Sequence, residues 1–335
     1  MSPRRGRRML TAVLALGLLA TACGTGDRDD LDDAAATGGG AQYPLTIENC
    51  GVDMTFDAPP ERVVLLESAP VTTMYELGVV DTAVLRAGAF PEEYYSDEVN
   101  AAIDGIDSLG EDVDESGHLQ ISREVVIAQQ PDLVMGLPDG ITREALADVG
   151  INALEQPVYC PQRSAATTFD DVYEQVETYG RIFDRRDEAA AVVASLRDRV
   201  AAAEQAVADA PERTAAVLYP TVGGGSGYAY GNKSMAHPQL EAAGFTNVFG
   251  DVDERVFEVT LEQIIEQDPD VLVLLYTDGD PAEVKDAVVD LPGAEGITAV
   301  RNDDILVQLF NFTEPPTPLS VDGLERIVER FGPGR

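Results

Sequence analysis

The sequence contains little positive charge. Its 335 residues include 23 lysines and arginines against 60 aspartates and glutamates, a formal net charge of −37, and the only lysines are Lys233 and Lys285. A surface this acidic repels phosphate backbones and anionic lipid headgroups. These repulsions exclude nucleic-acid binding and argue against a membrane-surface role for the body of the protein.

Histidine, tryptophan and cysteine are scarce as well. There is no tryptophan, and the two histidines are His118 and His237. Protein cages for zinc or manganese draw on several histidines and carboxylates, so two distant histidines argue against such a cage. Three cysteines without a Cys-x-x-Cys spacing give no support to redox catalysis or to a cysteine-based zinc site. We therefore assign no residue as a metal ligand.

The first 42 residues form a processing and tether segment. Four arginines within residues 4–8 precede a short apolar stretch at residues 9–20, which is typical of a signal peptide over residues 1–22. Cys23 follows two small residues, as in the lipobox of bacterial lipoproteins, which predicts lipidation of its thiol; a plain secretory signal is the alternative. Cleavage there removes four arginines and no acid, which lowers the charge from −37 to −41. Residues 23–42 are rich in Gly, Asp, Ala and Thr and predict a flexible tether.

The remaining cysteines, Cys50 and Cys160, form an even pair in an exported domain. The simplest interpretation is a disulfide. It would close a loop of about 110 residues, which contributes roughly 4 kcal/mol in the chain-entropy description. Two free buried thiols are the alternative.

From residue 43 onward, apolar strands alternate with helices. Buried strands are predicted at residues 62–66, 79–87, 131–136, 151–154, 215–219, 269–275 and 305–307. Helices are predicted at residues 69–77, 121–129, 142–149, 238–243, 261–266, 282–289 and 321–331. This alternation predicts parallel α/β layers.

A long helical segment interrupts this pattern at residues 168–210. It contains no proline up to residue 208 and no glycine except Gly180, and its apolar residues follow helical spacing. Either one helix bends near residues 180–185 or two helices abut there. A single helix of ~35 residues would span roughly 50 Å, more than the diameter of a small domain. We therefore expect the segment to run between two lobes.

The second half of the chain repeats a unit of the first. In residues 124–134 and 262–272, a glutamate begins a helix, Pro-Asp breaks it seven residues later, and an apolar strand follows. Proline and aspartate favour turns for local backbone reasons. The equal spacing of the unit in both halves, however, indicates two similar α/β lobes.

These features together resemble one protein family. The matching segments are ENCG at 48–51, APPERVV at 58–64, AAGFTNVF at 242–249 and AVRNDDILV at 299–307, besides both Glu…Pro-Asp units and the central helix. The chain resembles the substrate-binding lipoproteins of ABC importers for iron–siderophore complexes, a group that also serves haem and cobalamin. The resemblance covers nearly all of residues 43–335.

The resemblance implies an architecture and a cellular setting. It implies two Rossmann-like α/β lobes, residues 43–167 and 211–335, joined by a backbone helix over residues 168–210, with the ligand in the cleft between the lobes. The protein would be a monomer, held on the outer face of the cytoplasmic membrane by its lipid anchor alone. Its partners would be ABC permease and ATPase subunits, and it would carry a ligand but no cofactor.

No catalytic site emerges from the motifs. In the Gly-rich loop at residues 223–231, Asn232 stands where a phosphate-binding loop needs lysine, and Gly-Gly-Ser-Gly misses the pattern of a nucleophile elbow. The loop could let backbone approach a bulky ligand or be a mobile surface loop. Pairs of neighbouring acidic residues are expected by chance in a chain this acidic, so they do not indicate a catalytic site. We predict that the protein is not an enzyme; an exported, lipid-anchored hydrolase is the alternative, and it needs a histidine in the cleft.

We expect the cleft to capture a ferric siderophore, whose bulk calls for aromatic walls and a few polar contacts. The candidate aromatic residues are Phe90, Tyr94, Tyr95, Tyr159, Tyr219, Tyr228, Tyr230, Tyr276, Phe310 and Phe312. The candidate polar residues are Arg86, Arg163, Lys233, Arg255 and Asn311. Tyr95 and Tyr230 are the strongest candidates, because polar and glycine neighbours predict their exposure. Glu67 follows the first strand, where the family places cleft residues, and could equally bond the backbone.

The acidity of the chain bears on the ligand and the partner. It discourages polyanionic chelates, which favours neutral or cationic hydroxamate complexes over triply charged catecholates. Haem, with His237 near its iron, and cobalamin are alternatives, as is a binding protein that senses or scavenges without transport. For permease docking the family implies acidic residues at the lobe tips, where Glu76, Glu124 and Glu262 are conceivable; the last two could equally cap helices.

Overall fold

The computed structural model describes residues 43–110, 119–223 and 227–333. The predicted signal peptide, Cys23, the tether and His118 lie outside these residues. The described residues belong to one compact unit, residues 40–335. Within them, no helix combines the length and the apolar character that crossing a membrane requires.

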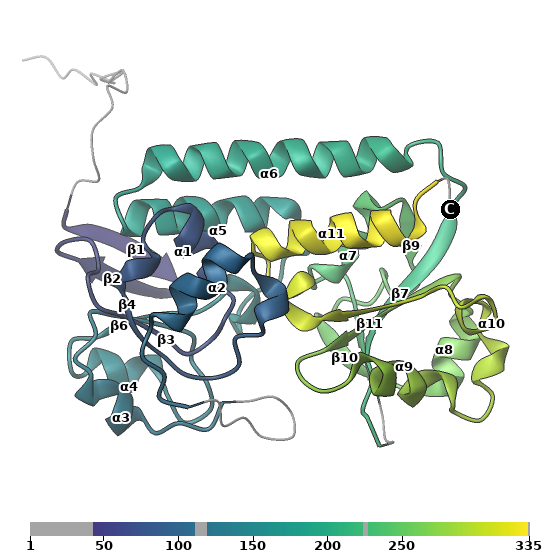
Figure 1. Cartoon of the computed structure of the whole chain (residues 1–335), viewed down its shortest axis with the longest axis horizontal. Coiled ribbons are helices and arrows are strands. Elements are labelled where there is room, and N and C mark those ends of the chain that lie inside the picture. Colours follow the sequence, from purple (N-terminus) through teal and green to yellow (C-terminus); the bar gives the residue numbers. More distant parts are fainter. Residues whose placement is uncertain (1–42, 111–118, 224–226, 334–335) are drawn as a thin grey trace, which may run out of the picture. The chain divides into compact units, whose positions relative to one another are not determined.

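The elements follow the predicted alternation (Figure 1). The strands are β1 (Leu45–Asn49), β2 (Val52–Phe56), β3 (Val63–Leu65), β4 (Ala83–Arg86), β5 (Leu133–Met135), β6 (Asn152–Leu154), β7 (Arg213–Tyr219), β8 (Gly227–Tyr230), β9 (Phe245–Asn247), β10 (Val256–Val259), β11 (Val271–Tyr276) and β12 (Ile305–Leu309). The helices are α1 (Val71–Glu76), α2 (Asp97–Asp104), α3 (Arg123–Ala128), α4 (Arg143–Ala147), α5 (Phe169–Ile182), α6 (Arg186–Val207), α7 (Ala236–Ala242), α8 (Leu261–Gln267), α9 (Pro281–Val289), α10 (Thr298–Asn302) and α11 (Pro318–Phe331).

The first lobe is built on a parallel sheet with the strand order β4-β3-β5-β6. Its central strands β3 and β5 are buried at every position, as expected for parallel strands covered on both faces. The antiparallel hairpin β1–β2 packs beside this sheet, where Asn49 Nδ2 donates to the carbonyl oxygen of Glu155 at 2.9 Å. The parallel layer predicted for this half is confirmed.

The second lobe is built on a mixed sheet with the order β10-β8-β7-β11-β12, and β9 also pairs with β7. Strands β7, β9, β11 and β12 are parallel, whereas β8 runs antiparallel to both β7 and β10. The expectation of a Gly-rich loop up to residue 231 is therefore wrong in part, because residues 227–230 form β8. Strand β8 pairs with β7, which precedes it, and with β10, which begins 29 positions after the start of β8, so no local pattern reveals the strand.

The two Pro-Asp turns have the same structural role in both lobes. Asp132 accepts hydrogen bonds from the backbone N–H groups of Glu61 and Arg62 at 2.8 and 3.0 Å, just before β3. Asp270 accepts from the N–H group of Thr214 at 2.9 Å, in β7. Each aspartate thus ties the start of its lobe's central strand to the neighbouring strand. The repeat is structural, as the matched spacing indicated.

Two helices, not one, occupy the central segment. Helices α5 and α6 pack against each other and turn at residues 183–185, so the alternative of a single bent helix is wrong. Gly180 allows the close approach, because a Cβ there would collide with the Cβ of Ala189. The 22 residues of α6 span about 33 Å, less than the roughly 50 Å expected of one long helix. Helix α6 still extends past elements of both lobes (Figure 1).

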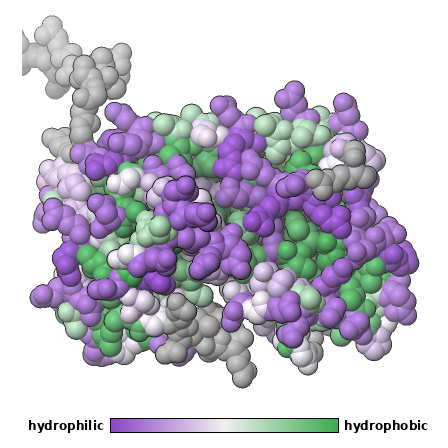
Figure 2. Space-filling model, in the orientation of Figure 1, coloured by the Kyte–Doolittle hydropathy of each residue, from purple (hydrophilic) through white to green (hydrophobic). Residues whose placement is uncertain are grey.

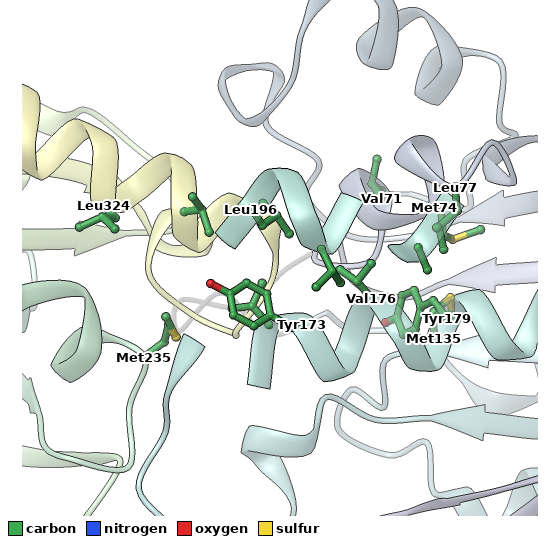
Figure 3. Packing of buried hydrophobic residues seen from close by; sticks show 14 of the residues in the cluster. Val71, Met74, Leu77, Met135, Tyr173, Val176, Tyr179, Leu196, Met235 and Leu324 are labelled. Carbon is green, nitrogen blue, oxygen red and sulfur yellow. The ribbon is translucent and has the colours of Figure 1, made fainter. Parts of the chain in front are cut away.

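One hydrophobic cluster continues from the first lobe into the second beneath these helices. It joins Val63 and Met135 of the first sheet to Val217 and Val273 of the second, through buried residues of α1, α5, α6 and α11. Figure 3 shows Tyr173, Val176 and Leu196 side by side in this layer. The two lobes therefore share a core along one side. On the face of the molecule seen in Figure 2, hydrophilic residues predominate along the outline and hydrophobic residues form separate patches.

A disulfide joins Cys50 to Cys160, with 5.1 Å between their Cα atoms. Cys50 and Gly51 form the two-residue turn between β1 and β2, and both have positive φ, 54° and 76°. Such hairpin turns require positive φ at both positions, which explains the glycine. The bond ties this turn to the segment that follows β6, directly beside Tyr159.

Candidate ligand-binding site

The loops at the carboxyl ends of the two sheets contact each other, and on one side hydrogen bonds join them. Asn311, after β12, donates from Nδ2 to Ser68 Oγ, after β3, at 2.9 Å. The backbone N–H group of Asn311 donates to the Tyr94 hydroxyl oxygen at 2.9 Å, and the rings of Tyr94 and Phe312 pack edge to face at 5.2 Å. We call Ser68, Tyr94, Asn311 and Phe312 the interlobe clasp. All four are buried, so their side chains hold the lobes together.

The remaining aromatic candidates on this side lie around the clasp. Tyr95 is half-buried and donates from its hydroxyl to the carbonyl oxygen of Ser68 at 3.1 Å; burial raises the pKa of its hydroxyl. The Tyr219 ring packs against that of Phe310 at 6.2 Å, and Tyr276 packs against the buried cluster behind the clasp. The predicted exposure of Tyr95 is only partial.

Arg86 and Phe90 form a pair of their own. The guanidinium group of Arg86 lies 5.2 Å from the centre of the Phe90 ring. Both side chains are half-buried, and a stacking of this kind is a typical cation–π contact. The pair keeps one of the predicted cations next to one of the predicted aromatic residues, in the first lobe.

A pocket of about 380 Å³ opens between the lobes, and no residue of the clasp lines it. Its lining comes from residues 158–163 of the first half of the chain and from residues 233 and 253–256 of the second. The lining residues are Val158, Tyr159, Cys160, Arg163, Lys233, Asp253, Glu254, Arg255 and Val256. Of the candidates from the sequence, the pocket thus brings together Tyr159, Arg163, Lys233 and Arg255.

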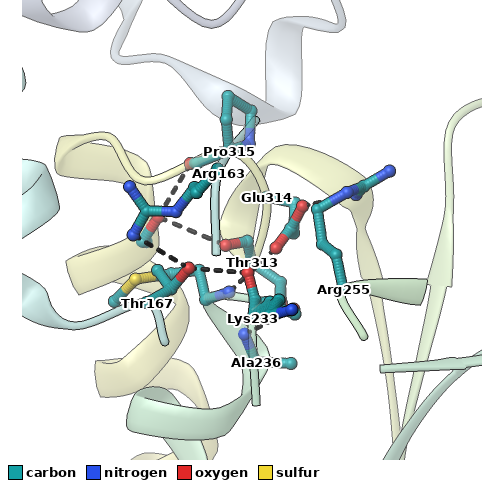
Figure 4. A network of polar contacts seen from close by, with 11 residues as sticks. Arg163, Thr167, Lys233, Ala236, Arg255, Thr313, Glu314 and Pro315 are labelled. Carbon is teal, nitrogen blue, oxygen red and sulfur yellow. Dashed lines mark hydrogen bonds and ion pairs between the residues drawn. The ribbon is translucent and has the colours of Figure 1, made fainter. Parts of the chain in front are cut away.

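Arg255 is fixed by a buried carboxylate that the sequence did not reveal. Its Nη1 atom lies 2.6 Å from Oε2 of Glu314, whose side chain is fully buried. The other oxygen of Glu314 accepts from the backbone N–H group of Met235 at 2.8 Å. The guanidinium group also lies 5.0 Å from the centre of the Tyr159 ring, so Arg255 bridges the two lobes. Figure 4 shows Arg255 and Glu314 within a wider set of polar contacts that includes Thr167 and Lys233.

The pKa values in the network follow from its burial and pairing. Burial opposes the charged form of Arg255, but the carboxylate of Glu314 and the neighbouring tyrosines outweigh it, so the pKa of Arg255 lies above its ordinary value. Burial raises the pKa of Tyr159 well above 10, and Glu314 adds to this rise. Arg255 is therefore a permanent cation beside a neutral phenol.

The other two cations of the pocket are paired as well. Lys233 Nζ lies 3.1 Å from Asp253, and Arg163 Nη2 lies 2.8 Å from Asp171. The hydroxyl of Thr167 donates to the carbonyl oxygen of Lys233 at 2.6 Å, which ties the segment before α5 to the second lobe. Every cation that lines the pocket thus has a carboxylate partner.

The two tyrosines of β8 lie differently from each other. Tyr230 is only 3% exposed and belongs to the hydrophobic core, so the predicted exposure is wrong. Pairing of β8 between β7 and β10 buries it, which its glycine and polar neighbours did not indicate. Tyr228 is 40% exposed and faces Tyr219 across the β7–β8 pair, but it does not line the pocket.

Glu67 occupies a protected position after β3. Its Oε1 atom accepts from Gln156 Nε2 at 2.8 Å. Burial raises the pKa of Glu67 to about 8, and the hydrogen bond from Gln156 opposes this rise. Gly136 makes room for it, because a Cβ at this position would lie 2.9 Å from Cγ of Glu67 and the φ angle is +93°. Glu67 therefore accepts a hydrogen bond from a side chain, and the alternative of a hydrogen bond with the backbone is wrong.

Of the two histidines on which the haem and hydrolase alternatives depend, the structure describes His237. His237 lies on α7 at 3.6 Å from Glu241 and does not line the pocket, and His118 lies outside the described residues. Residues 43–110, 119–223 and 227–333 contain no group of three or more histidines, cysteines or carboxylates placed to hold a metal ion.

This chain matches the model of one protein family and resembles several known proteins. Residues 63–307 match the model of the family described as periplasmic binding protein. A crystal structure from Saccharomonospora viridis, described as an ABC-type Fe3+-hydroxamate transport system, is 74% identical, covers 87% of this chain and 99% of its own, and has a TM-score of 0.84. A cobalamin-binding protein of Halobacterium salinarum is 29% identical over 296 residues, 86% of this chain and 74% of that protein.

A more distant structure shows the same fold. The periplasmic heme-binding protein RhuT from Roseiflexus sp. RS-1 is 18% identical, covers 81% of this chain and 97% of its own, and has a TM-score of 0.63. The family match extends over most of both lobes, from β3 to β12. The chain belongs to the periplasmic binding protein family.

Proposed function

We propose that this chain is the extracytoplasmic solute-binding component of an ABC importer and that it captures a ferric siderophore of the hydroxamate type. The observation that carries this proposal is the 74% identity to the Saccharomonospora viridis structure over 87% of the chain. Members of the family bind solutes and act with ABC permease and ATPase subunits, so the proposal assigns no enzymatic activity. Three exposed glutamates stay candidates for permease docking: Glu76 at the end of α1, and Glu124 and Glu262 at the starts of α3 and α8.

The chemistry of the pocket supports a chelate without net negative charge. Its volume of about 380 Å³ lies in the usual range for small-molecule sites. Tyr159 and two valines supply apolar contact, and Arg255 supplies donors for the partly negative oxygens of a hydroxamate. Because the lining cations are paired with carboxylates, a triply negative catecholate complex would meet no unpaired cation among them.

The same proposal includes the parts of the chain outside the described residues. Cleavage before Cys23 and lipidation of its thiol would anchor the protein to the outer face of the cytoplasmic membrane. The division into lobes at residues 43–167 and 211–335, joined by residues 168–210, suits this role, because the shared core along α5 and α6 would limit the movement of the lobes.

Cobalamin is the second candidate ligand. The relative from Halobacterium salinarum favours it, since that protein is named as cobalamin-binding and aligns over 86% of this chain. Haem receives less support, because His237 does not line the pocket.

Calorimetric titration of the purified protein tests the proposal. The ligands are a neutral ferric trihydroxamate, the same hydroxamate without iron, a ferric tris-catecholate, haem and cyanocobalamin. We expect 1:1 binding of the ferric trihydroxamate with a dissociation constant at or below the micromolar level, and weaker binding of the others. Binding of cobalamin alone would transfer the assignment to the second candidate, and binding of none of these ligands would contradict both.

A further inference from the structure

Glu314 is the most deeply buried of the carboxylates that pair with the cations of the pocket. The side chain of Asp253, the partner of Lys233, is 76% exposed, and that of Asp171, the partner of Arg163, is 16% exposed. Glu314 is fully buried, and so is every residue from 311 to 320 around it. One carboxylate oxygen bonds the Met235 N–H group at the start of α7, and the other bonds Arg255. Its negative charge is therefore a fixed part of the site.

We infer that Glu314 is a specificity-determining residue, which orients Arg255 and cancels its charge so that the pocket selects chelates of zero or positive charge. This inference rests on the proposed function, since it concerns the same pocket.

The geometry of the pair supports this role. Arg255 lines the pocket, while Glu314 lies behind it and does not line the pocket itself. Arg255 makes one side-chain hydrogen bond to the described residues, through Nη1 to Glu314. A guanidinium group has five N–H donors in a fixed plane, so the other donors are left for the oxygen atoms of a ligand. Glu314 thus keeps the donors in place without touching the ligand.

The electrostatic consequence follows from the distance. A carboxylate 2.6 Å from the guanidinium group leaves a dipole where an isolated arginine would present a full charge. The partial charges of a neutral hydroxamate complex interact well with such a dipole. A complex of charge −3 is attracted to Arg255 and repelled by Glu314, which lies further from the ligand, so Glu314 offsets part of the attraction that an unpaired arginine would provide.

The variant Glu314→Gln tests the role directly. A glutamine oxygen can still accept from the Met235 N–H group, so the backbone contact is kept while the charge is lost. Asp304→Asn is the matched control, because Asp304 pairs with Arg213 at the same distance of 2.6 Å and neither residue lines the pocket. The readout is the ratio of the dissociation constants for a neutral ferric trihydroxamate and a triply anionic ferric tris-catecholate.

We expect Glu314→Gln to shift this ratio on the order of tenfold toward the anionic chelate and Asp304→Asn to leave it unchanged. Glu314→Asp, which retains the charge, should stay close to the unmodified protein. Equal losses of affinity for both chelates in Glu314→Gln would overturn the inference, because a purely structural residue would act in that way. If the unmodified protein binds neither chelate, the proposed function fails as well.

A measurement on the unmodified protein does not depend on the folding of a variant. Raising the ionic strength should leave the affinity for the anionic chelate unchanged or strengthen it, since no unpaired cation of the pocket attracts the ligand. A marked loss of affinity with salt would mean that the ligand meets an uncompensated cation. That result would overturn the inference while leaving the binding of hydroxamates intact.

Discussion

Asn311 and Ser68, 243 positions apart in the chain, share a buried hydrogen bond of 2.9 Å between the amide of one and the hydroxyl of the other. This contact closes one side of the space between the lobes, together with Tyr94 and Phe312. The lining of the pocket, where Arg255 and Tyr159 meet, contains none of these four residues. The molecule thus has a buried contact that holds the lobes together and, in addition, a polar pocket that can admit a ligand.

Removing the clasp amide should destabilise the protein. Asn311→Ala leaves the buried Ser68 hydroxyl without its donor, and a lost buried hydrogen bond of this kind costs about 1–2 kcal/mol. Urea denaturation measures the change in the free energy of unfolding. Asn302→Ala, at an exposed position of α10, is the control and should change it by less than about 0.5 kcal/mol. Equal stabilities of the two variants would contradict the role of the clasp.

The disulfide should stabilise the fold and support the pocket. Replacing both Cys50 and Cys160 by serine releases a bond across 110 positions, and such a loss typically costs about 2–4 kcal/mol. Because Cys160 lines the pocket beside Tyr159, we also expect weaker ligand binding at temperatures where the variant remains folded. Denaturation and titration of the same sample measure both effects. A variant with unchanged stability would show that the bond is dispensable.

Glu67 should make stability fall as the pH rises. Burial raises its pKa from 4.5 to about 8 in the folded protein, so the folded state holds a proton that the unfolded state releases. The stabilisation is complete below pH 4.5 and is lost as the pH rises toward 8.

The variant Glu67→Gln isolates this effect. It cannot ionise, so the unmodified protein should lose stability relative to it, on the order of 3 kcal/mol between pH 5 and 8. Urea denaturation of both proteins across this range provides the measurement. Parallel curves for the two proteins would show that Glu67 titrates normally.

Gly323 should tolerate no side chain. A Cβ there would collide with the carbonyl oxygen of Phe312 and lie 2.8 Å from Nε2 of Gln239, and overpacking of this kind costs about 1–3 kcal/mol or more. Gly323→Ala should therefore lower the melting temperature and loosen the clasp. In Gly227→Ala, the control, the nearest atom to the added Cβ is 3.6 Å away. A thermal scan that shows the same small change for both would contradict the packing described here.

Most of the scaffold could be predicted from the sequence, because its signals are local. Apolar β-branched runs identify β3, β5 and β11, and the two Pro-Asp turns indicate the repeated lobe. Strands β1, β2, β8, β9 and β10 were not predicted. Strand β8 was missed because its burial depends on β7 and β10, which pair with it from both sides. The same long-range pairing explains why Tyr230 is buried in the hydrophobic core and not exposed.

The candidate site was predictable only in part. Tyr159 and Arg255 were recognisable as an aromatic and a cation on loops, and the structure brings them together. Glu314 was not, because a glutamate followed by two prolines in an acidic chain has the pattern of a surface turn. Its burial comes from packing of residues 310–320 against the first lobe and α7, which involves partners as distant as Ser68.

The proposed function places a ferric hydroxamate in the pocket beside Arg255. A crystal structure of the protein grown with a ferric trihydroxamate tests this placement, because the anomalous scattering of iron locates the metal. We expect a single iron peak inside the pocket, with chelate oxygens hydrogen-bonded to Arg255 and the ligand against the Tyr159 ring. An iron peak outside this pocket, or none in crystals that contain the chelate at saturating concentration, would contradict this placement.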